Sequence, residues 1–126
     1  MEVASGHREK VTVFGDDYDT IDGTGVRDYV HVSDLARAHL AAIDILSRHQ
    51  SATINLGSQK QYSVMDVIRL TEKITGKEIP YEVVGRREGD PDKIYASSEN
   101  ALNLLGWSAK DSELNNIIET TWRIYK

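Results

Sequence analysis

The sequence predicts one domain of mixed α and β structure, with too few alternating units for a complete doubly wound sheet. Short runs rich in β-branched residues alternate with segments of helical periodicity along the 126 residues. Neither a repeat nor a linker long enough to divide the chain interrupts this alternation. A chain of this length can bury a core of its own without disulfide bonds, and it contains no cysteine. We therefore expect residues 1–126 to form a single domain.

The extended segments are predicted from short apolar runs that end at turn-forming residues. The first run ends at Gly15, and an acidic loop with four Asp and two Gly follows over residues 16–25. Alternating residues after this loop are typical of a second strand. Pro80 near the start of a later run favours a strand at the edge of a sheet. The predicted extended segments are residues 11–14, 27–32, 53–56, 79–84 and 93–96.

Two long helices are predicted in the first part of the chain. Ser33 is interpreted as the N-cap of a helix over residues 34–48, because serine hydroxyls accept the first free amide hydrogens. Residues 63–66 resemble a capping box with Asp in place of Glu, and Gly76 is a suitable stop for the helix that follows. The expected buried faces are Leu35, Ala38, Ala42, Ile43 and Leu46 in the first helix, and Val64, Val67, Ile68, Thr71 and Ile74 in the second.

Two further helices are predicted near the C-terminal end. Ser98 is expected to cap a short helix that ends at Gly106, and Ser112 is expected to open the last helix. Trp107 is interpreted as a core residue rather than a stacking platform. The side chains of the last helix that should face inward are Leu114, Ile117, Ile118, Trp122 and Tyr125.

Composition excludes several classes of function. The formal net charge of −5 argues against nucleic-acid binding, which depends on clustered Lys and Arg. No apolar run approaches the roughly 20 residues of a membrane span, and the first residues lack an apolar signal core, so we expect a cytoplasmic protein. The four histidines offer no close pair, and we expect no metal site. A catalytic cysteine and a Gly-x-Ser-x-Gly motif are both absent from the sequence.

Two glycine- and acid-rich patterns are rejected as ligand sites. Residues 23–28 imitate a dinucleotide fingerprint, but Asp28 replaces the third glycine and an extended segment follows where a helix should begin. The acidic loop might suggest a calcium site, but its spacing and its flanking segments do not match an EF-hand. We interpret it as a turn-forming loop exposed to solvent.

Arginines in Gly- and Asp-rich loops point to an anion site. Arg27 and the pair Arg86 and Arg87 offer planar forks of donors that remain charged and can bind phosphate oxygens in a bidentate manner. The alternative is that each arginine pairs with a neighbouring carboxylate: Asp28 for Arg27, and Glu88 or Asp90 for the later pair. Spacing alone favours these ion pairs.

A family resemblance favours anion binding by these arginines over the local ion pairs. Residues 13–20 (VFGDDYDT) and 23–36 (GTGVRDYVHVSDLA) closely resemble the C-terminal portion of the UDP-glucose 4-epimerases, which are extended short-chain dehydrogenase/reductase enzymes that hold NAD tightly. The resemblance continues through residues 54–57 (INLG), 86–90 (RREGD) and 105–107 (LGW). It covers nearly the whole chain.

The resemblance implies a UDP-sugar site in this chain, and NAD binding in an N-terminal portion that lies outside it. By position, Arg27 and Arg87 would bind the diphosphate, and Asp90 would accept a hydrogen bond from a ribose hydroxyl. The uridine pocket would be lined by Thr12, Val13 and Phe14. Ile94 falls where the family often has Tyr or a small residue facing the sugar, so the preferred hexose stays open.

The family's chemical groups are missing from these residues. Its acid/base pair is a Tyr followed four positions later by a Lys, and no Tyr of this chain has a Lys there. We therefore expect the substrate-binding portion of a larger enzyme, inactive alone and without a bound cofactor. The alternatives are an interaction module that associates through exposed apolar faces, and a related nucleotide-sugar epimerase or dehydratase. Sister families usually lack residues 16–20. Their presence favours a portion of a UDP-glucose 4-epimerase over a related epimerase or dehydratase.

Overall fold

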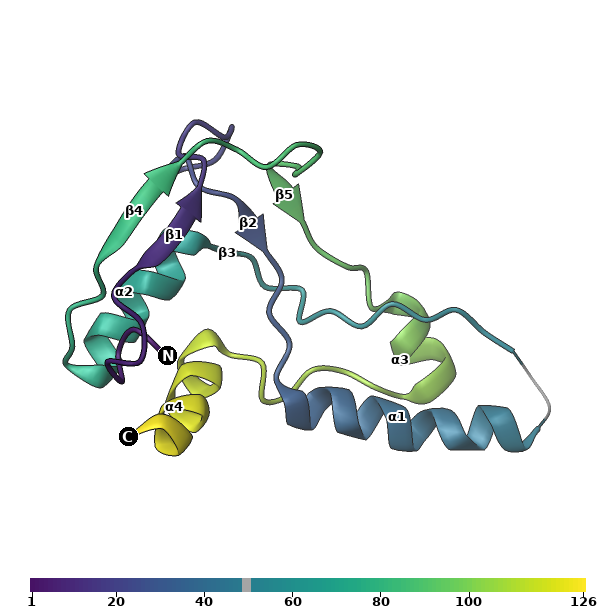
Figure 1. The fold of residues 1–126 in the computed structure, drawn as a ribbon. Helices are drawn as coiled ribbons and strands as arrows, with labels where there is room; N and C mark the ends of the chain where they lie inside the picture. Colours follow the sequence, from purple (N-terminus) through teal and green to yellow (C-terminus); the bar gives the residue numbers. More distant parts are fainter. Residues whose placement is uncertain (49–50) are drawn as a thin grey trace.

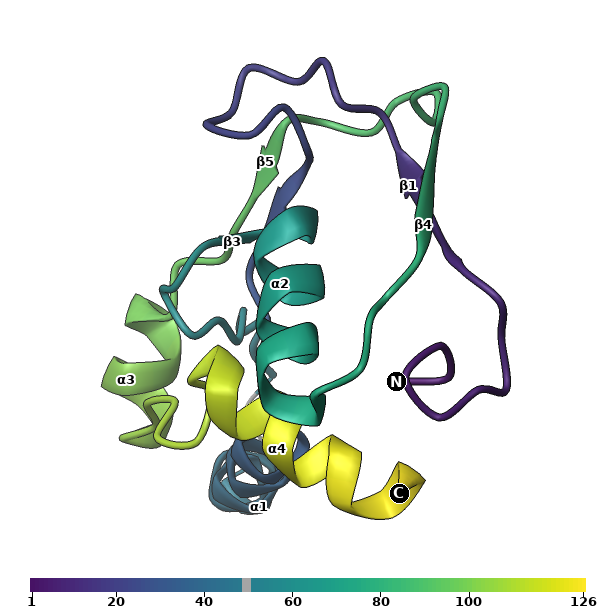
Figure 2. The ribbon, with the colours of Figure 1, turned by 90° about the vertical axis from the view of Figure 1, so that its left-hand side faces the viewer.

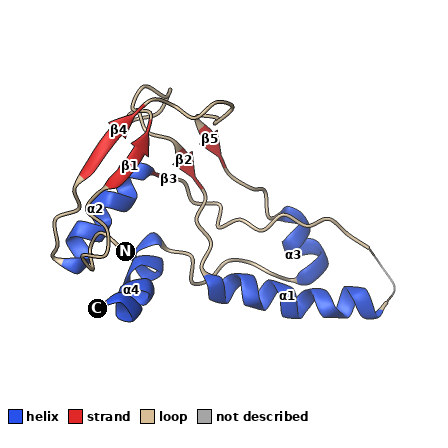
Figure 3. Cartoon of the chain, viewed as in Figure 1, coloured by secondary structure: helices blue, strands red, loops and turns tan. Residues whose placement is uncertain are grey.

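A computed structural model describes residues 1–48 and 51–126. Figure 1 shows α2 and α4 on one side of the molecule and α1 and α3 on the other, with the short strands β2, β3 and β5 between them. Figure 3 shows how little of the chain lies in strands. The elements are β1 (Val11–Phe14), β2 (Val26–Arg27), α1 (Val32–Ser47), β3 (Tyr62–Ser63), α2 (Val64–Thr75), β4 (Tyr81–Val84), β5 (Lys93–Ile94), α3 (Glu99–Leu105) and α4 (Leu114–Tyr125).

The strands form two small sheets. In the first, β1 and β4 run parallel, with Val11 opposite Tyr81 and Phe14 opposite Val84. In the second, β2 lies between β3 and β5, antiparallel to β3 and parallel to β5. Figure 2, turned by 90°, shows the two sheets apart with α2 drawn between them. Two loops cross from the first sheet to the second, because β1 leads to β2 and β4 leads to β5.

The second helix confirms its predicted start and stop. The Ser63 hydroxyl accepts a hydrogen bond from the Asp66 amide, and the Asp66 carboxylate accepts one from the Ser63 amide. Gly76 ends α2 in the left-handed conformation at φ 66°. Local chemistry decides both ends of this helix, and it is readable in the sequence.

The start of α1 differs from the prediction that Ser33 is its N-cap. His31 occupies that position, and its imidazole Nδ1 accepts a hydrogen bond from the Ser33 amide at 3.0 Å. Ala38 is buried as expected, but Ile43 and Leu46 are 57% and 65% exposed. The predicted buried face of α1 is therefore wrong for its second half.

Two other serines also serve a purpose other than capping. Ser98 stands at the N-cap position of α3, but its hydroxyl exchanges hydrogen bonds with the backbone of Gly57. The last helix begins at Leu114 with Glu113 as N-cap, so the prediction that Ser112 opens it is wrong. The Ser112 hydroxyl instead donates to buried Asp34. Both side chains fasten distant segments together.

Several predicted extended segments are shorter than expected. Residues 53–56 form no strand, because Ile54 and Leu56 pack against the buried residues Ala38 and Trp107 rather than joining a sheet. Only Arg27 of residues 27–32 lies in a strand: residues 28–31 connect β2 to α1, and Val32 already belongs to the helix. The predicted segment 79–84 is reduced to its last four residues, and 93–96 to its first two.

The core consists of two clusters. Val13, Ile68, Ile79 and Ala4 form the first, between β1 and α2. Ala38, Ala101 and Trp107 form the second, between α1 and α3, which confirms Trp107 as a core residue. Leu114 and Ile118 of α4 are buried as predicted, whereas Tyr125 is 39% exposed. In the part of the chain that the structure describes, no helix is both long and apolar enough to cross a membrane.

Candidate functional site

The candidate site lies where two loops leave the first sheet. Residues 16–25, the acidic loop, follow the carboxyl end of β1, and residues 85–92, which we call the arginine loop, follow the carboxyl end of β4. Because β1 and β4 are parallel, both loops start from the same edge, and Figure 1 shows them together at the top of the molecule. The carboxyl ends of parallel strands are the usual place for ligands in open sheets.

Arg27 and Asp90 form an ion pair across this region. The Arg27 guanidinium Nη2 donates to the Asp90 carboxylate, and its Nη1 donates to the backbone oxygen of Val26 at 2.8 Å. Both charged side chains are about a quarter exposed, at 24% and 26%. The partner of Arg27 is therefore Asp90 rather than the neighbouring Asp28. Asp28 accepts hydrogen bonds from the amide and hydroxyl of Ser58 instead.

Arg87 lies on the aromatic ring of β1. Its guanidinium carbon is 3.7 Å from the centre of the Phe14 ring, which is a cation–π contact. The backbone oxygen of Arg87 accepts a hydrogen bond from the Asp90 amide at 3.2 Å, which turns the arginine loop back on itself. Within residues 1–48 and 51–126, Arg87 forms no ion pair with Glu88 or Asp90. Its exposed charge is thus available to an anion.

The three β1 residues predicted to line the uridine pocket differ in their burial. Thr12 and Phe14 are half-buried, whereas Val13 is 1% exposed and its side chain belongs to the core. Alternation along a strand places Thr12 and Phe14 on one face and Val13 on the other. The structure thus pairs Arg27 with Asp90 and Arg87 with Phe14, and the turn from Arg87 to Asp90 joins the two contacts. Thr12 lies on the same face of the strand as Phe14. The Val13 side chain is directed into the core.

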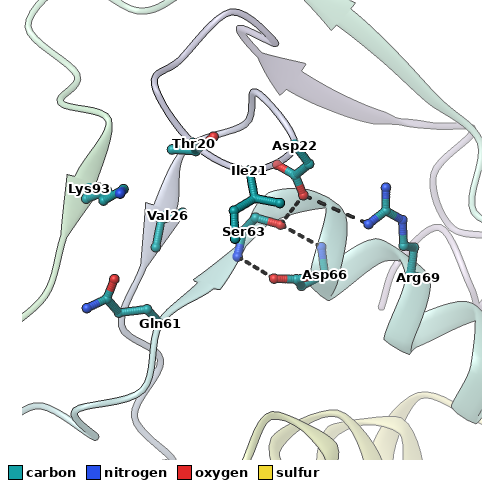
Figure 4. Close-up of a pocket in the computed structure, with 9 residues that line it drawn as sticks. All are labelled: Thr20, Ile21, Asp22, Val26, Gln61, Ser63, Asp66, Arg69 and Lys93. Atoms are coloured by element: carbon teal, nitrogen blue, oxygen red, sulfur yellow. Dashed lines mark hydrogen bonds and ion pairs between the residues drawn. The ribbon is translucent and has the colours of Figure 1, made fainter.

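A hollow of about 220 Å³ adjoins the acidic loop and was not predicted from the sequence. Figure 4 shows Asp22 between Ser63 and Arg69 at its wall, with Lys93 and Gln61 on the other side. Burial raises the pKa of Asp22, but hydrogen bonds from Ser63 and Thr24 outweigh that effect and leave the pKa below its ordinary value. Asp22 is therefore a charged carboxylate, and its hydrogen bond from Ser63 links the acidic loop to the start of α2.

Gly23 explains why the acidic loop can fold so tightly. Its φ is +78°, and a Cβ at this position would lie 1.9 Å from the backbone oxygen of Asp16. The two residues thus approach too closely for any side chain. Among the described residues no group of acidic or histidine side chains could hold a metal ion, and His49 lies outside them.

Comparison with known proteins shows similarity to one family of enzymes. The model of the NAD dependent epimerase/dehydratase family matches residues 1–57. A UDP-glucose 4-epimerase from Bos taurus is 51% identical over 126 residues, which are 99% of this chain and 36% of that protein. Over almost all of its length, the chain is similar to this protein. The UDP-glucose 4-epimerase of Corynebacterium glutamicum is 47% identical over 122 residues, which are 97% of this chain and 37% of the relative.

Solved structures of the epimerase family confirm the fold class. A UDP-glucose 4-epimerase from Stenotrophomonas maltophila with bound NAD and formylated UDP-arabinopyranose has a TM-score of 0.90 at 42% identity, covering 98% of this chain and 37% of that one. The enzyme from Bifidobacterium longum in complex with NAD+ and UDP has a TM-score of 0.84 at 44% identity, covering 95% and 36%. The chain thus has the fold of the C-terminal portion of these enzymes and spans little more than a third of their length.

Proposed function

We propose that this chain binds UDP-sugars as the substrate-binding portion of a UDP-glucose 4-epimerase that interconverts UDP-galactose and UDP-glucose. The observation that supports this most directly is that one loop supplies both Asp90, which pairs with Arg27, and Arg87, which lies on Phe14, at the carboxyl ends of two parallel strands. Homologous structures that hold UDP or a UDP-sugar add to this support. In the proposal, Arg27 and Arg87 bind the diphosphate, and Thr12 and Phe14 of β1 border the uridine, with only the backbone of Val13 between them.

The Arg27–Asp90 ion pair suggests an exchange of partners on binding. A diphosphate oxygen would replace the Asp90 carboxylate on Arg27 Nη2, because a phosphate oxygen accepts the same kind of charge-assisted hydrogen bond. Asp90 would then be free to accept a hydrogen bond from a ribose hydroxyl. Arg87 would keep its contact with the Phe14 ring, which leaves the edges of its guanidinium for phosphate oxygens.

The residues of this chain do not fit the NAD that the family uses. Gly23 and Gly25 lie between β1 and β2 and lead into a strand, whereas the dinucleotide fingerprint opens a helix that receives the diphosphate. We place NAD binding and its hydride chemistry in residues outside these 126. The contribution of this chain is to bind and orient the nucleotide.

Calorimetry with UDP tests the binding role. Arg27→Ala and Arg87→Ala should each weaken UDP binding by about 1.5–3 kcal/mol, the usual contribution of a hydrogen bond to a charged group. Arg123→Ala is the matched control, because that arginine is exposed in the last turn of α4. Equal UDP affinity in all four proteins would refute the assignment.

An activity assay tests whether the reacting groups lie outside these 126 residues. The chain with added NAD should not convert UDP-galactose to UDP-glucose, whereas a complete UDP-glucose 4-epimerase in the same assay should. Detectable conversion by this chain would show that the reacting groups are among its own residues.

A second candidate function, a self-associating interaction module, is favoured by one feature of α1. Leu40, Ile43 and Leu46 are 67%, 57% and 65% exposed, and such apolar surface promotes association. The occupant in this proposal is a second copy of the chain. Light scattering should then show a mass that rises with concentration, and Leu46→Lys should lower it. A monomer at every concentration would refute self-association and leave the nucleotide-binding proposal untouched.

A further inference from the structure

Arg86 and Arg87 are neighbours in sequence but contact different parts of the molecule. Arg87 lies on Phe14, in the candidate site. Arg86 faces the acidic loop, where its Nε donates to Asp17 Oδ1 at 2.7 Å and its Nη2 donates to the Asp17 backbone oxygen. Its guanidinium carbon is also 4.1 Å from the centre of the Tyr18 ring. All of these contacts direct Arg86 toward protein groups.

The arginine loop is fastened to the acidic loop near both of its ends. Arg86 makes the contact at the start, and Asp92 makes it at the end, where its carboxylate accepts the Asp19 amide at 3.1 Å. The backbone oxygen of Asp92 accepts the amide of Val26, the first residue of β2, at 2.8 Å. Arg86 Nη1 lies 3.6 Å from Asp92 Oδ1 and so connects the two ends.

The groups of the proposed nucleotide site lie between these two attachments. Arg87 and Asp90 are the residues of the loop that contact Phe14 and Arg27. A short segment held near both ends has few conformations left, so its attachments decide where these two side chains lie. Phosphate binding depends on such placement, because a bidentate contact requires a fixed geometry.

Packing at the end of β1 supports the same conclusion. Tyr18 is 4% exposed, and Gly15 has a φ of +88°. A Cβ on Gly15 would lie 2.7 Å from both Arg86 Cγ and Tyr18 Cε2, so the stem of Arg86 rests on a backbone that only glycine allows. Arg86 is thus packed against the acidic loop as well as bonded to it.

We infer that Arg86 is a positioning residue for the nucleotide site, which it serves by fastening the arginine loop to Asp17 and Asp92 without contacting phosphate itself. The inference rests on the proposed function. Its competitor is that Arg86 is a third phosphate ligand, since it stands beside Arg87 in an exposed loop. The two ideas predict different UDP affinities when Asp17, the acidic partner of Arg86, is replaced.

Removal of Asp17 separates the two ideas by the sign of the effect. Loss of an acidic side chain near an anion site should strengthen UDP binding if simple charge decides, because one repulsion disappears. Loss of the Arg86 attachment should weaken it by about fivefold, the upper range for an exposed ion pair. Asp17 is 73% exposed on its side chain, so Asp17→Ala should leave the fold intact.

The experiment measures the dissociation constants of UDP and of uridine by calorimetry for each variant of the full chain. Asp17→Ala and Arg86→Gln should weaken UDP binding by similar factors and uridine binding by a smaller factor, because uridine loses only the placement of Asp90 whereas UDP also loses that of Arg87. Asp16→Ala is the matched control: it removes an exposed acid from the same loop that forms no ion pair within residues 1–48 and 51–126. It should not weaken UDP binding. Circular dichroism confirms the fold of each variant.

The other outcomes contradict either the positioning inference or the proposed function. If Asp17→Ala binds UDP as tightly as Asp16→Ala while Arg86→Gln is weakened, Arg86 contacts phosphate and the positioning inference is overturned. If neither Asp17→Ala nor Arg86→Gln changes UDP binding, while Arg27→Ala and Arg87→Ala do, the loop needs no attachment and the inference also fails. If Arg27→Ala and Arg87→Ala have no effect, the proposed function itself fails.

Discussion

Asp34→Asn should destabilise the fold strongly, because Asp34 is fully buried and each of its oxygens accepts two hydrogen bonds. Oδ1 accepts from Arg37 and from the Lys110 amide at 2.9 Å, and Oδ2 accepts from the Asp111 amide at 2.9 Å and from the Ser112 hydroxyl. Asparagine has one acceptor oxygen, so whichever way its amide turns, one backbone N–H is left without a partner. That loss costs about 1–3 kcal/mol, and the remaining bonds lose their charge. We expect a total of about 3 kcal/mol.

Urea unfolding followed by circular dichroism measures this loss. The midpoint should fall while the slope with denaturant stays the same, since the surface exposed on unfolding is unchanged. Asp44→Asn is the matched control, because Asp44 is exposed on the same helix and should change the free energy of unfolding by less than about 0.5 kcal/mol. A loss below about 1 kcal/mol for Asp34→Asn would show that these hydrogen bonds do not hold α1 to the segment before α4.

Two further stability predictions concern the buried Asp34 carboxylate and the capping box of α2. Burial raises the pKa of Asp34, but hydrogen bonds from Lys110, Ser112 and Asp111 outweigh it and hold the pKa below its ordinary 3.8. Its stabilising effect should therefore be complete above that value and decline as pH falls through the lowered folded-state pKa, and acid titration of unfolding should show a flatter decline in Asp34→Asn. Ser63→Ala should cost about 1–2 kcal/mol in urea unfolding because it removes the α2 cap, and a loss no larger than that of Ser47→Ala on α1 would contradict this.

Local chemistry explains what could be predicted from the sequence. The start of α2 at Ser63 and its end at Gly76 depend on residues within one turn of each other, and both are as predicted. The sequence indicates that residues 11–14 and 79–84 are extended, but it does not indicate that β1 and β4 pair in parallel or in which register. The prediction that Arg27, Arg87 and Asp90 share one site comes from the family resemblance more than from any spacing.

Distant partners explain what could not be predicted. The choice of Asp90 over Asp28 as the partner of Arg27 depends on how the arginine loop folds over β2, 63 residues away in sequence. Ser112 looks like an N-cap from its neighbours, yet its hydroxyl is drawn to Asp34, 78 residues earlier. The different roles of Arg86 and Arg87 are likewise invisible in sequence, since both stand in the same charged run.

The account rests on two guanidinium groups that bind one diphosphate, and side-chain NMR of the arginines tests this most directly. In a titration of the ¹⁵N-labelled chain with UDP, the Nε–Hε signals of Arg27 and Arg87 should move together and saturate at the same UDP concentration. The signal of Arg123 should stay in place. If the signals of Arg27 and Arg87 do not move while UDP binds elsewhere, the central claim is wrong.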